Sequence, residues 1–218
     1  MYGVHHGPGA FAAHFITRGS DVQFFGVDYV YPEKGSADLS TTTYVYFAFT
    51  GLLDPTSVEG AVSISPSVPS YTSAWNNYIE LYPQNRFATN THYTVTLATS
   101  LKSTNGTHLP APYMLDFTTQ PFMISWISPS DGSTNVHRST SIYVSCNDVL
   151  DGETIPSAFS ISPAVSGIFS ISESSFSFIP SSTLAPKTAY TVTVASSLKS
   201  SSGSPLPGAM VATFTTSE

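Results

Sequence analysis

The stretch Tyr93-Thr94-Val95-Thr96 returns as Tyr190-Thr191-Val192-Thr193, and this repetition decides the organisation of the chain. Residues 24–120 align with residues 121–217 without a gap, at an offset of 97 positions and with 33 identical pairs. Self-similarity at one fixed spacing indicates a duplicated structural unit. We therefore divide the chain into an N-terminal extension, 1–23, and two homologous modules, 24–120 and 121–218.

Within each copy, apolar and polar residues alternate over short stretches. Every second residue is strongly apolar in segment 44–49, and the same holds for its counterpart 141–146. A period of two is typical of a strand with one buried face. The 16 prolines and 14 glycines interrupt the chain often, and no stretch of twelve residues keeps a helical period. About seven short strands in each copy predict an all-β protein of two Greek-key β-sandwiches.

The composition fits folded β-sandwiches with hydroxyl-rich surfaces. Hydrophobic residues make up 41% of the chain, so it can form real cores, whereas charged residues make up only 10% and Ser plus Thr number 62. With seven Lys plus Arg and a net charge of −7, we expect no nucleic-acid partner. No apolar run approaches the roughly 20 residues of a transmembrane segment. The N-terminus lacks the features of a signal peptide, so a leader would lie outside this sequence.

The second copy carries motifs of a known family. The turn Pro129-Ser130-Asp131-Gly132 precedes the strand 141–144, and Phe178-Ile179-Pro180, the strand 190–194 and Phe214-Thr215-Thr216 follow it. With these motifs, residues 121–217 resemble the bacterial Ig-like domain family typified by the S-layer protein SbsA. The resemblance implies a spacer, surface-layer or adhesin module outside the cell, without enzymatic activity.

The first copy departs from the family pattern at its start. Tyr31-Pro32-Glu33-Lys34-Gly35 stands in place of the Pro-x-Asp-Gly turn, but Tyr93 and Phe117-Thr118-Thr119 are kept. The expected fold class is therefore all-β, with two tandem Ig-like Greek-key β-sandwiches and an extra N-terminal strand.

The extra strand is predicted within residues 1–23, which match neither copy. Phe11, Ala13, Phe15 and Thr17 occupy alternate positions there, which favours a strand of eight or nine residues. Each module already has its own first strand, and an isolated strand is not stable in water. We predict that it adds to the sandwich of a neighbouring copy and builds a head-to-tail filament of identical subunits. The alternatives are a segment that packs on its own module, a leader remnant, or the end of a preceding domain.

The junction between the copies has almost no spare residues. Phe117-Thr118-Thr119 closes the first copy, Phe122-Met123-Ile124 opens the second, and Pro121 restricts Gln120 between them. This spacing predicts a stiff rod.

Motifs of catalysis and cofactor binding are missing from the sequence. It contains no Gly-x-Ser-x-Gly, no His-Glu-x-x-His and no phosphate-binding glycine loop, so we expect no enzyme, no cofactor and no metal. Cys146 takes the inward position of Phe49 and is interpreted as a small buried hydrophobe. Asp148, Asp151 and Glu153 could offer oxygens to Ca²⁺, which needs six to eight of them, but a solvated turn is favoured.

Two surface features are candidate sites for glycans. Asn105-Gly106-Thr107 is the one Asn-x-Ser/Thr sequon of the chain, so Asn105 is a candidate for glycosylation in a loop. Tyr71, Trp75 and Tyr78 could form a platform on which a sugar ring stacks, and the second copy has no aromatic residue at these positions. The alternative is that Trp75 caps the edge of its sandwich.

The sequence thus predicts a non-catalytic structural subunit, extracellular or at the cell surface, that polymerises into a filament or surface layer by addition of its N-terminal strand. The alternatives are a carbohydrate- or surface-binding adhesin module, with glycans as partners, and spacer domains of a larger secreted protein.

Overall fold

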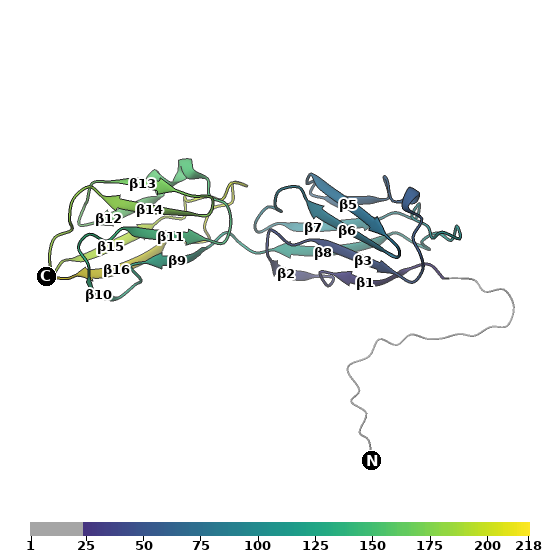
Figure 1. The fold of residues 1–218 in the computed structure, drawn as a ribbon, viewed down its shortest axis with the longest axis horizontal. Helices are drawn as coiled ribbons and strands as arrows, with labels where there is room; N and C mark the ends of the chain where they lie inside the picture. Colours follow the sequence, from purple (N-terminus) through teal and green to yellow (C-terminus); the bar gives the residue numbers. More distant parts are fainter. Residues whose placement is uncertain (1–23) are drawn as a thin grey trace, which may run out of the picture.

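The computed structural model describes residues 24–218, which form two β-sandwiches placed end to end (Figure 1). Module 1 contains strands β1 to β8 and module 2 contains strands β9 to β16. The all-β prediction is confirmed, with eight strands in each module instead of about seven. The predicted strand at Phe11, Ala13, Phe15 and Thr17 lies outside the described residues.

The two modules have the same elements in the same order. Module 1 comprises β1 (Val27–Tyr31), β2 (Ser36–Leu39), β3 (Val45–Phe49), the 3₁₀ turn η1 (Pro55–Ser57), β4 (Val62–Ser65), β5 (Ser70–Trp75), β6 (Tyr78–Pro83), β7 (His92–Leu97) and β8 (Tyr113–Thr119). Module 2 comprises β9 (Ile124–Ser128), β10 (Ser133–Val136), β11 (Ile142–Cys146), η2 (Gly152–Thr154), α1 (Ile155–Ala158), β12 (Phe159–Ser162), β13 (Gly167–Ile171), β14 (Ser175–Pro180), β15 (Ala189–Val194) and β16 (Met210–Thr216).

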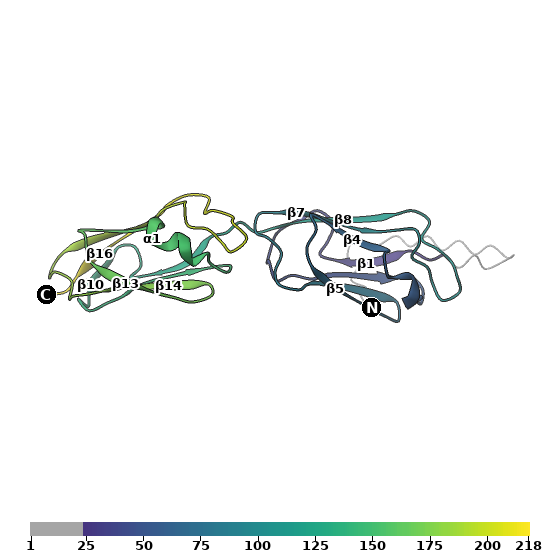
Figure 2. The ribbon, with the colours of Figure 1, turned by 90° about the horizontal axis from the view of Figure 1, so that it is seen from above.

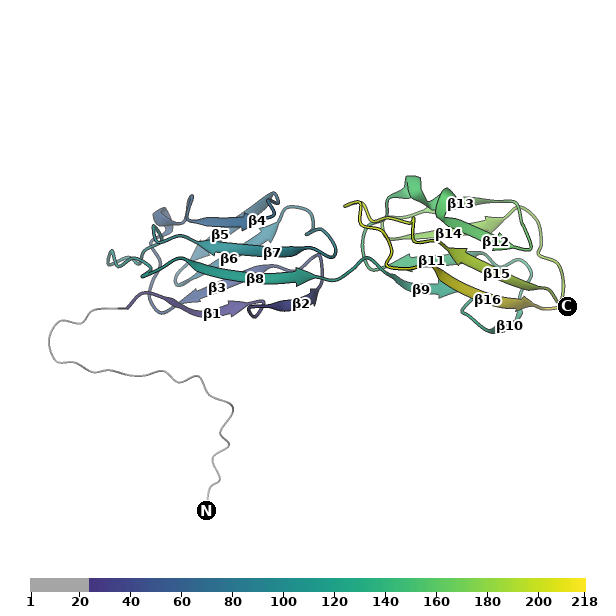
Figure 3. The same ribbon diagram turned by 180° about the vertical axis from the view of Figure 1, so that it is seen from behind.

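Each module consists of two four-stranded sheets packed face to face, as Figure 2 shows from above. We call β1-β3-β6-β5 and its counterpart β9-β11-β14-β13 the front sheets, and β2-β8-β7-β4 and β10-β16-β15-β12 the back sheets. The front sheets of both modules face the viewer in Figure 1, and the back sheets do so in Figure 3. Both front sheets therefore lie on the same side of the rod.

Each sandwich has its own hydrophobic core. The core of module 1 includes residues from Phe25 to Phe117, and the core of module 2 includes residues from Phe122 to Phe214. The alternation predicted from the sequence is confirmed in β3 and β11, where the inward residues are buried, including Phe49 and Cys146. Because the two cores are separate, a large part of each module's stability is its own.

The repeated Tyr-Thr-Val-Thr and Phe-Thr-Thr motifs form the same hydrogen-bonded corner in both modules. The hydroxyl of Tyr93 accepts a hydrogen bond from the Ala88 amide at 2.9 Å, and the hydroxyl of Thr119 donates to the Ala88 carbonyl at 2.6 Å. In module 2, Tyr190 and Thr216 hold both backbone groups of Ala185 in the same way, at 3.0 and 2.6 Å. This corner satisfies backbone groups where the chain crosses between sheets, as in other β-sandwiches with a tyrosine corner.

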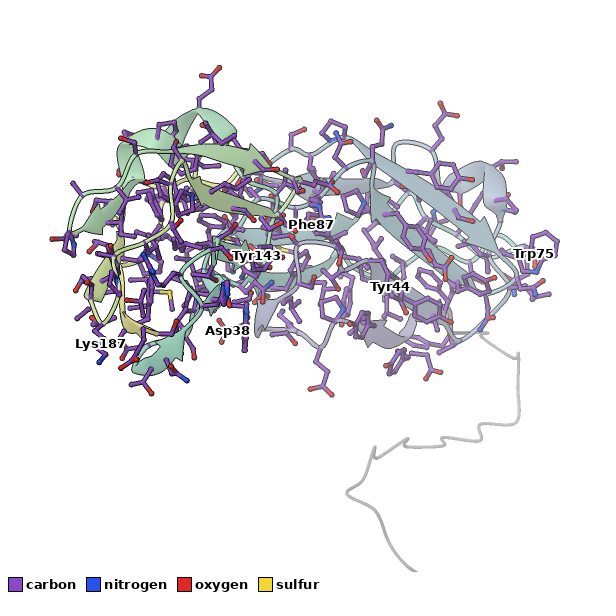
Figure 4. The ribbon with its side chains drawn as sticks, turned by 60° about the vertical axis from the view of Figure 1, so that its left-hand side comes forward. Asp38, Tyr44, Trp75, Phe87, Tyr143 and Lys187 are labelled. Carbon is purple, nitrogen blue, oxygen red and sulfur yellow. The ribbon has the colours of Figure 1, made fainter. Side chains whose placement is uncertain are left out.

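A left-handed backbone conformation also recurs at equivalent positions of the two modules. Asp38 and Asn135 both have φ of 56°, and Asn90 and Lys187 have φ of 49° and 48° (Asp38 and Lys187 are labelled in Figure 4). Asn and Asp tolerate this region better than most residues. Lys187 is therefore the least suitable of the four.

Candidate functional site

A metal cluster and a nucleophilic thiol are the first two kinds of reactive centre to consider. Within residues 24–218, no three His, Cys, Asp or Glu side chains gather as a metal site would require. Cys146 is buried, as predicted, and this burial raises the pKa of its thiol to about 12. Because the thiolate is the nucleophilic form, Cys146 is a poor nucleophile near neutral pH. In the same part of the chain, no helix has the length and apolarity to cross a membrane.

The prediction of a solvated turn at residues 148–153 is wrong for Asp148. Its side chain is only 4% exposed, because the loop after β6 of module 1 covers it. The carboxylate accepts a hydrogen bond from the Val149 amide at 2.8 Å and lies 3.6 Å from the Arg86 guanidinium. The repeat alignment could not reveal this contact, since it joins the two modules.

The contact between Arg86 and Asp148 belongs to a wider junction. On the linker side, the Asn147 side chain donates to the Pro121 carbonyl and accepts from the Met123 amide, both at 2.8 Å. Across the modules, the Ser204 hydroxyl donates to the Thr89 carbonyl at 3.4 Å. A cleft of about 380 Å³ lies beside these contacts, lined by Asn85, Arg86, Phe87, Asp148, Val149, Glu173, Ser201 and Ser202. The linker is thus held by polar contacts on both sides.

Module 2 contacts the junction with the end that carries Asp148. The equivalent end of module 1 points away from module 2. Its cleft, of about 430 Å³, is lined by Phe24, Phe25, Thr50, Gly51, Leu52, Ser103, Thr104 and Asn105. We call this end the N-terminal pole. Phe24 and Leu52 are 66% and 58% exposed there, and Gly51 stands where module 2 has Asp148. The pole therefore offers apolar surface without the buried carboxylate.

Asn105, the candidate for glycosylation, lies at the N-terminal pole. It is exposed in the loop after Leu101, as the sequence predicted. Its side-chain oxygen accepts hydrogen bonds from the Thr107 amide, at 3.1 Å, and from the Ser103 hydroxyl. Modification of Asn105 itself stays a prediction.

The three candidate sugar-stacking residues share the outer face of the front sheet of module 1. Tyr71 and Trp75 lie on the edge strand β5 and are 63% and 64% exposed. Tyr78 lies on β6 and pairs in register with Trp75. In Figure 4, Trp75 lies at the end of module 1 that is remote from module 2. The high exposure argues against the alternative in which Trp75 caps the edge, because a capping ring would be covered.

Five further tyrosines lie on this same face, and the sequence analysis did not identify them as a site. They are Tyr29 and Tyr31 of β1, Tyr44 and Tyr46 at β3, and Tyr82 of β6. The signal was present in part, since Tyr44 and Tyr46 occupy the outward positions of an alternating segment. The order of the strands, which brings β1 beside β3 and β6, was not visible in the sequence.

The eight aromatic residues form two rows across the four strands. In the first row, Tyr46 contacts Tyr29 and Tyr78, with ring centroids 6.1 and 5.5 Å apart, and Trp75 stands opposite Tyr78.

In the second row, Tyr44 contacts Tyr31 and Tyr82, with ring centroids 5.1 and 5.3 Å apart, and Tyr71 stands opposite Tyr82. We call the eight residues together the tyrosine face.

Glu80 places a carboxylate within the tyrosine face. Its backbone pairs with Tyr46 on one side and Ser73 on the other. Partial burial raises the pKa of Tyr82 above its usual value, and the charge of Glu80 and a hydrogen bond to it raise it further. Burial also raises the pKa of Tyr46, together with its neighbours Tyr78 and Glu80. Both hydroxyls therefore remain protonated near neutral pH and can donate hydrogen bonds.

Comparison with known families confirms the expected fold class. The model of the family described as "Bacterial Ig-like domain" matches residues 21–119 and again residues 119–216. None of the curated proteins compared with the chain matches it. The predicted likeness to the S-layer protein SbsA in particular stays a prediction.

Several solved structures are similar to the chain at low sequence identity. L,D-transpeptidase 3 from Mycobacterium tuberculosis matches with 15% identity over 56% of this chain and 44% of that chain, with a TM-score of 0.32. L,D-transpeptidase 1 from the same organism matches with 17% identity over 55% and 46%, with a TM-score of 0.33. The N-terminal part of the bacterial S-layer protein SbsC matches with 15% identity over 87% and 44%, with a TM-score of 0.33. The chain spans less than half the length of each of these.

Proposed function

Because the chain belongs to the bacterial Ig-like domain family, we propose that it is a non-catalytic extracellular or cell-surface unit whose two modules form a stiff spacer. The observation that carries this proposal is the junction, where module 1 covers the buried carboxylate of Asp148 with Arg86. A buried carboxylate that loses its cationic partner is costly. Bending the rod at the junction would separate this pair and expose the cleft beside it.

The test is a distance measurement between the modules. Ser63 and Ser160 occupy equivalent exposed positions in β4 and β12, so a spin label at each position, in a Cys146→Ser background, reports how the modules are oriented. We expect a narrow distribution of distances for the otherwise native chain. Arg86→Met should broaden it, because Asp148 then lies buried without its cation.

Lys34→Met provides the matched control. Lys34 pairs with Asp116 at 3.9 Å within module 1, and its side chain is 61% exposed. Its loss removes the same charge but should leave the distribution narrow. A broad distribution in the native chain would refute the stiff spacer.

The finer part of the proposal is that these rods polymerise head to tail, by pairing of residues 11–17 with a sheet edge of a neighbouring copy. Two features of the described residues support it. The front sheet of each module ends in a strand, β5 or β13, that pairs on one side only within residues 24–218. In addition, the N-terminal pole has the exposed apolar residues Phe24 and Leu52, where the equivalent end of module 2 is docked on another module.

Removal of residues 1–23 tests this mechanism. The remaining chain contains both complete cores, so we expect folded monomers, while the full chain forms filaments or larger assemblies visible by negative-stain electron microscopy and light scattering. Polymers formed equally by the truncated chain would contradict strand addition. If both chains are monomers, the filament proposal is refuted, whereas the spacer proposal is unaffected.

A further inference from the structure

Neither the fold nor the spacer role requires the tyrosine face. Module 2 folds in the same way with Ser128, Ser141 and Ser175 at the positions of Tyr31, Tyr44 and Tyr78. Exposed aromatic patches on a sheet mark binding surfaces when folding does not explain them. The rings pack against one another, and six of the eight are exposed to solvent.

The charges of this face restrict the class of ligand. The strands β1, β3, β5 and β6 contain no Lys, Arg or His, and their two carboxylates are Asp28 and Glu80. Nucleic acids, anionic lipids and acidic polymers would therefore meet negative charge without a compensating cation. The face therefore does not suit an anionic ligand.

The distribution of polar atoms favours a sugar over an apolar protein surface. Each tyrosine presents a flat apolar ring and a hydroxyl, and Glu80 adds a carboxylate between the rows. Such amphipathic rings suit a ligand with both apolar faces and many hydroxyl groups, because each hydroxyl displaced from water finds a partner. A pyranose has both features, whereas a purely apolar partner would bury the charge of Glu80 and offer it no hydrogen bond of its own.

A second copy of the chain fits this face less well. Two identical faces related by a twofold axis would bring the Glu80 carboxylates of both copies into one apolar interface. Like charges in such an interface cost free energy.

We propose that the tyrosine face binds a neutral polysaccharide, whose successive sugar rings lie along the rows that cross β1, β3, β6 and β5. Trp75 and Tyr71 end the two rows on the edge strand, where their exposure leaves their faces accessible. The front sheet of module 2 has the same strand order but lacks the two aromatic rows. The proposed glycan-binding surface therefore lies on one sheet of module 1.

The experiment is affinity electrophoresis of the full chain in native gels that contain hydroxyethylcellulose, xylan, mannan or dextran. We expect at least one of these neutral polymers to retard the protein. The edge variant Tyr71→Ser/Trp75→Ser should weaken the retardation at least about tenfold, as the loss of two stacking rings implies. The central variant Tyr44→Ser/Tyr82→Ser should do the same.

Matched controls separate binding from folding. Trp126→Ser and Tyr143→Ser remove the two exposed aromatic residues of the front sheet of module 2, and both should leave the retardation unchanged. Thermal unfolding followed by circular dichroism identifies any variant that fails to fold. Should the central variant fail, the edge variant decides, because its side chains are nearly two-thirds exposed.

Four results would overturn the proposal. They are the absence of retardation by all four polymers, equal retardation of the edge variant and the native chain, binding to heparin or phosphatidylglycerol vesicles instead, and self-association that the edge variant abolishes. None of these results bears on the spacer, which rests on the distances between labels.

Discussion

The front sheets of the two modules share a backbone but differ in what they show to solvent. At nine equivalent outward positions, module 1 has Tyr29, Tyr31, Tyr44, Tyr46, Tyr71, Trp75, Tyr78, Glu80 and Tyr82, whereas module 2 has Trp126, Ser128, Ser141, Tyr143, Ile168, Ser172, Ser175, Ser177 and Ile179. One aromatic residue of module 1, Tyr46, has an identical counterpart, Tyr143. After the duplication, the backbone fold was kept while the outward side chains diverged, because outward side chains contribute little to the core.

The two modules should differ most in stability when the equivalent inward residues Phe49 and Cys146 are replaced. Phe49 is buried and stacks on Phe25 with ring centroids 5.2 Å apart, so Phe49→Ala should destabilise module 1 by about 3–5 kcal/mol. Cys146→Ala removes only a sulfur atom from the core of module 2 and should cost about 1 kcal/mol.

Urea unfolding followed by tryptophan fluorescence measures both effects. Trp75 and Trp126 are the two tryptophans of the chain, one in each module, so Trp126→Phe and Trp75→Phe backgrounds report on module 1 and module 2 respectively. Similar losses for the two alanine variants would contradict the expectation that the larger buried side chain contributes more to stability.

Removal of the tyrosine hydroxyl from the hydrogen-bonded corner should reduce the stability of each module by a smaller amount. Tyr93→Phe leaves the Ala88 amide without its acceptor, and Tyr190→Phe does the same to the Ala185 amide. Because these amides are only partly buried, each lost hydrogen bond should cost about 0.5–1.5 kcal/mol. We expect similar losses in the two modules by the same fluorescence assay. A loss in one module alone would mean that the corners are equivalent in geometry but not in energy.

The smallest expected effect concerns the left-handed turn before β7 and β15. Lys187→Asn installs the residue that module 1 has at position 90, and should stabilise module 2 by up to about 1 kcal/mol, since Asn tolerates positive φ better. The exposed ion pair of Lys187 with Glu218 contributes little to offset this. The reciprocal change, Asn90→Lys, should destabilise module 1 by a similar amount. Thermal unfolding of both variants checks the sign.

The fold was largely predictable because its signals are local. Strand positions follow from alternation such as that of segment 44–49, and the internal repeat shows that the alternation occurs twice. The exposure of Asn105 also follows from its place in a loop. The solvated environment expected for Asp148 was wrong, because its partner Arg86 comes from the other module.

The duplication, the two cores and the inward residues could be identified from the sequence alone. Apolar residues alternate with a period of two, and the two copies are offset by 97 positions. Only the tertiary structure decided which outward residues gather. Tyr29 and Trp75 are far apart in sequence, and they lie on one face because the hydrogen-bonded order β1-β3-β6-β5 places their strands in one sheet. That order is set by how the two sheets bury a common core, which is a property of the whole module and of no single segment.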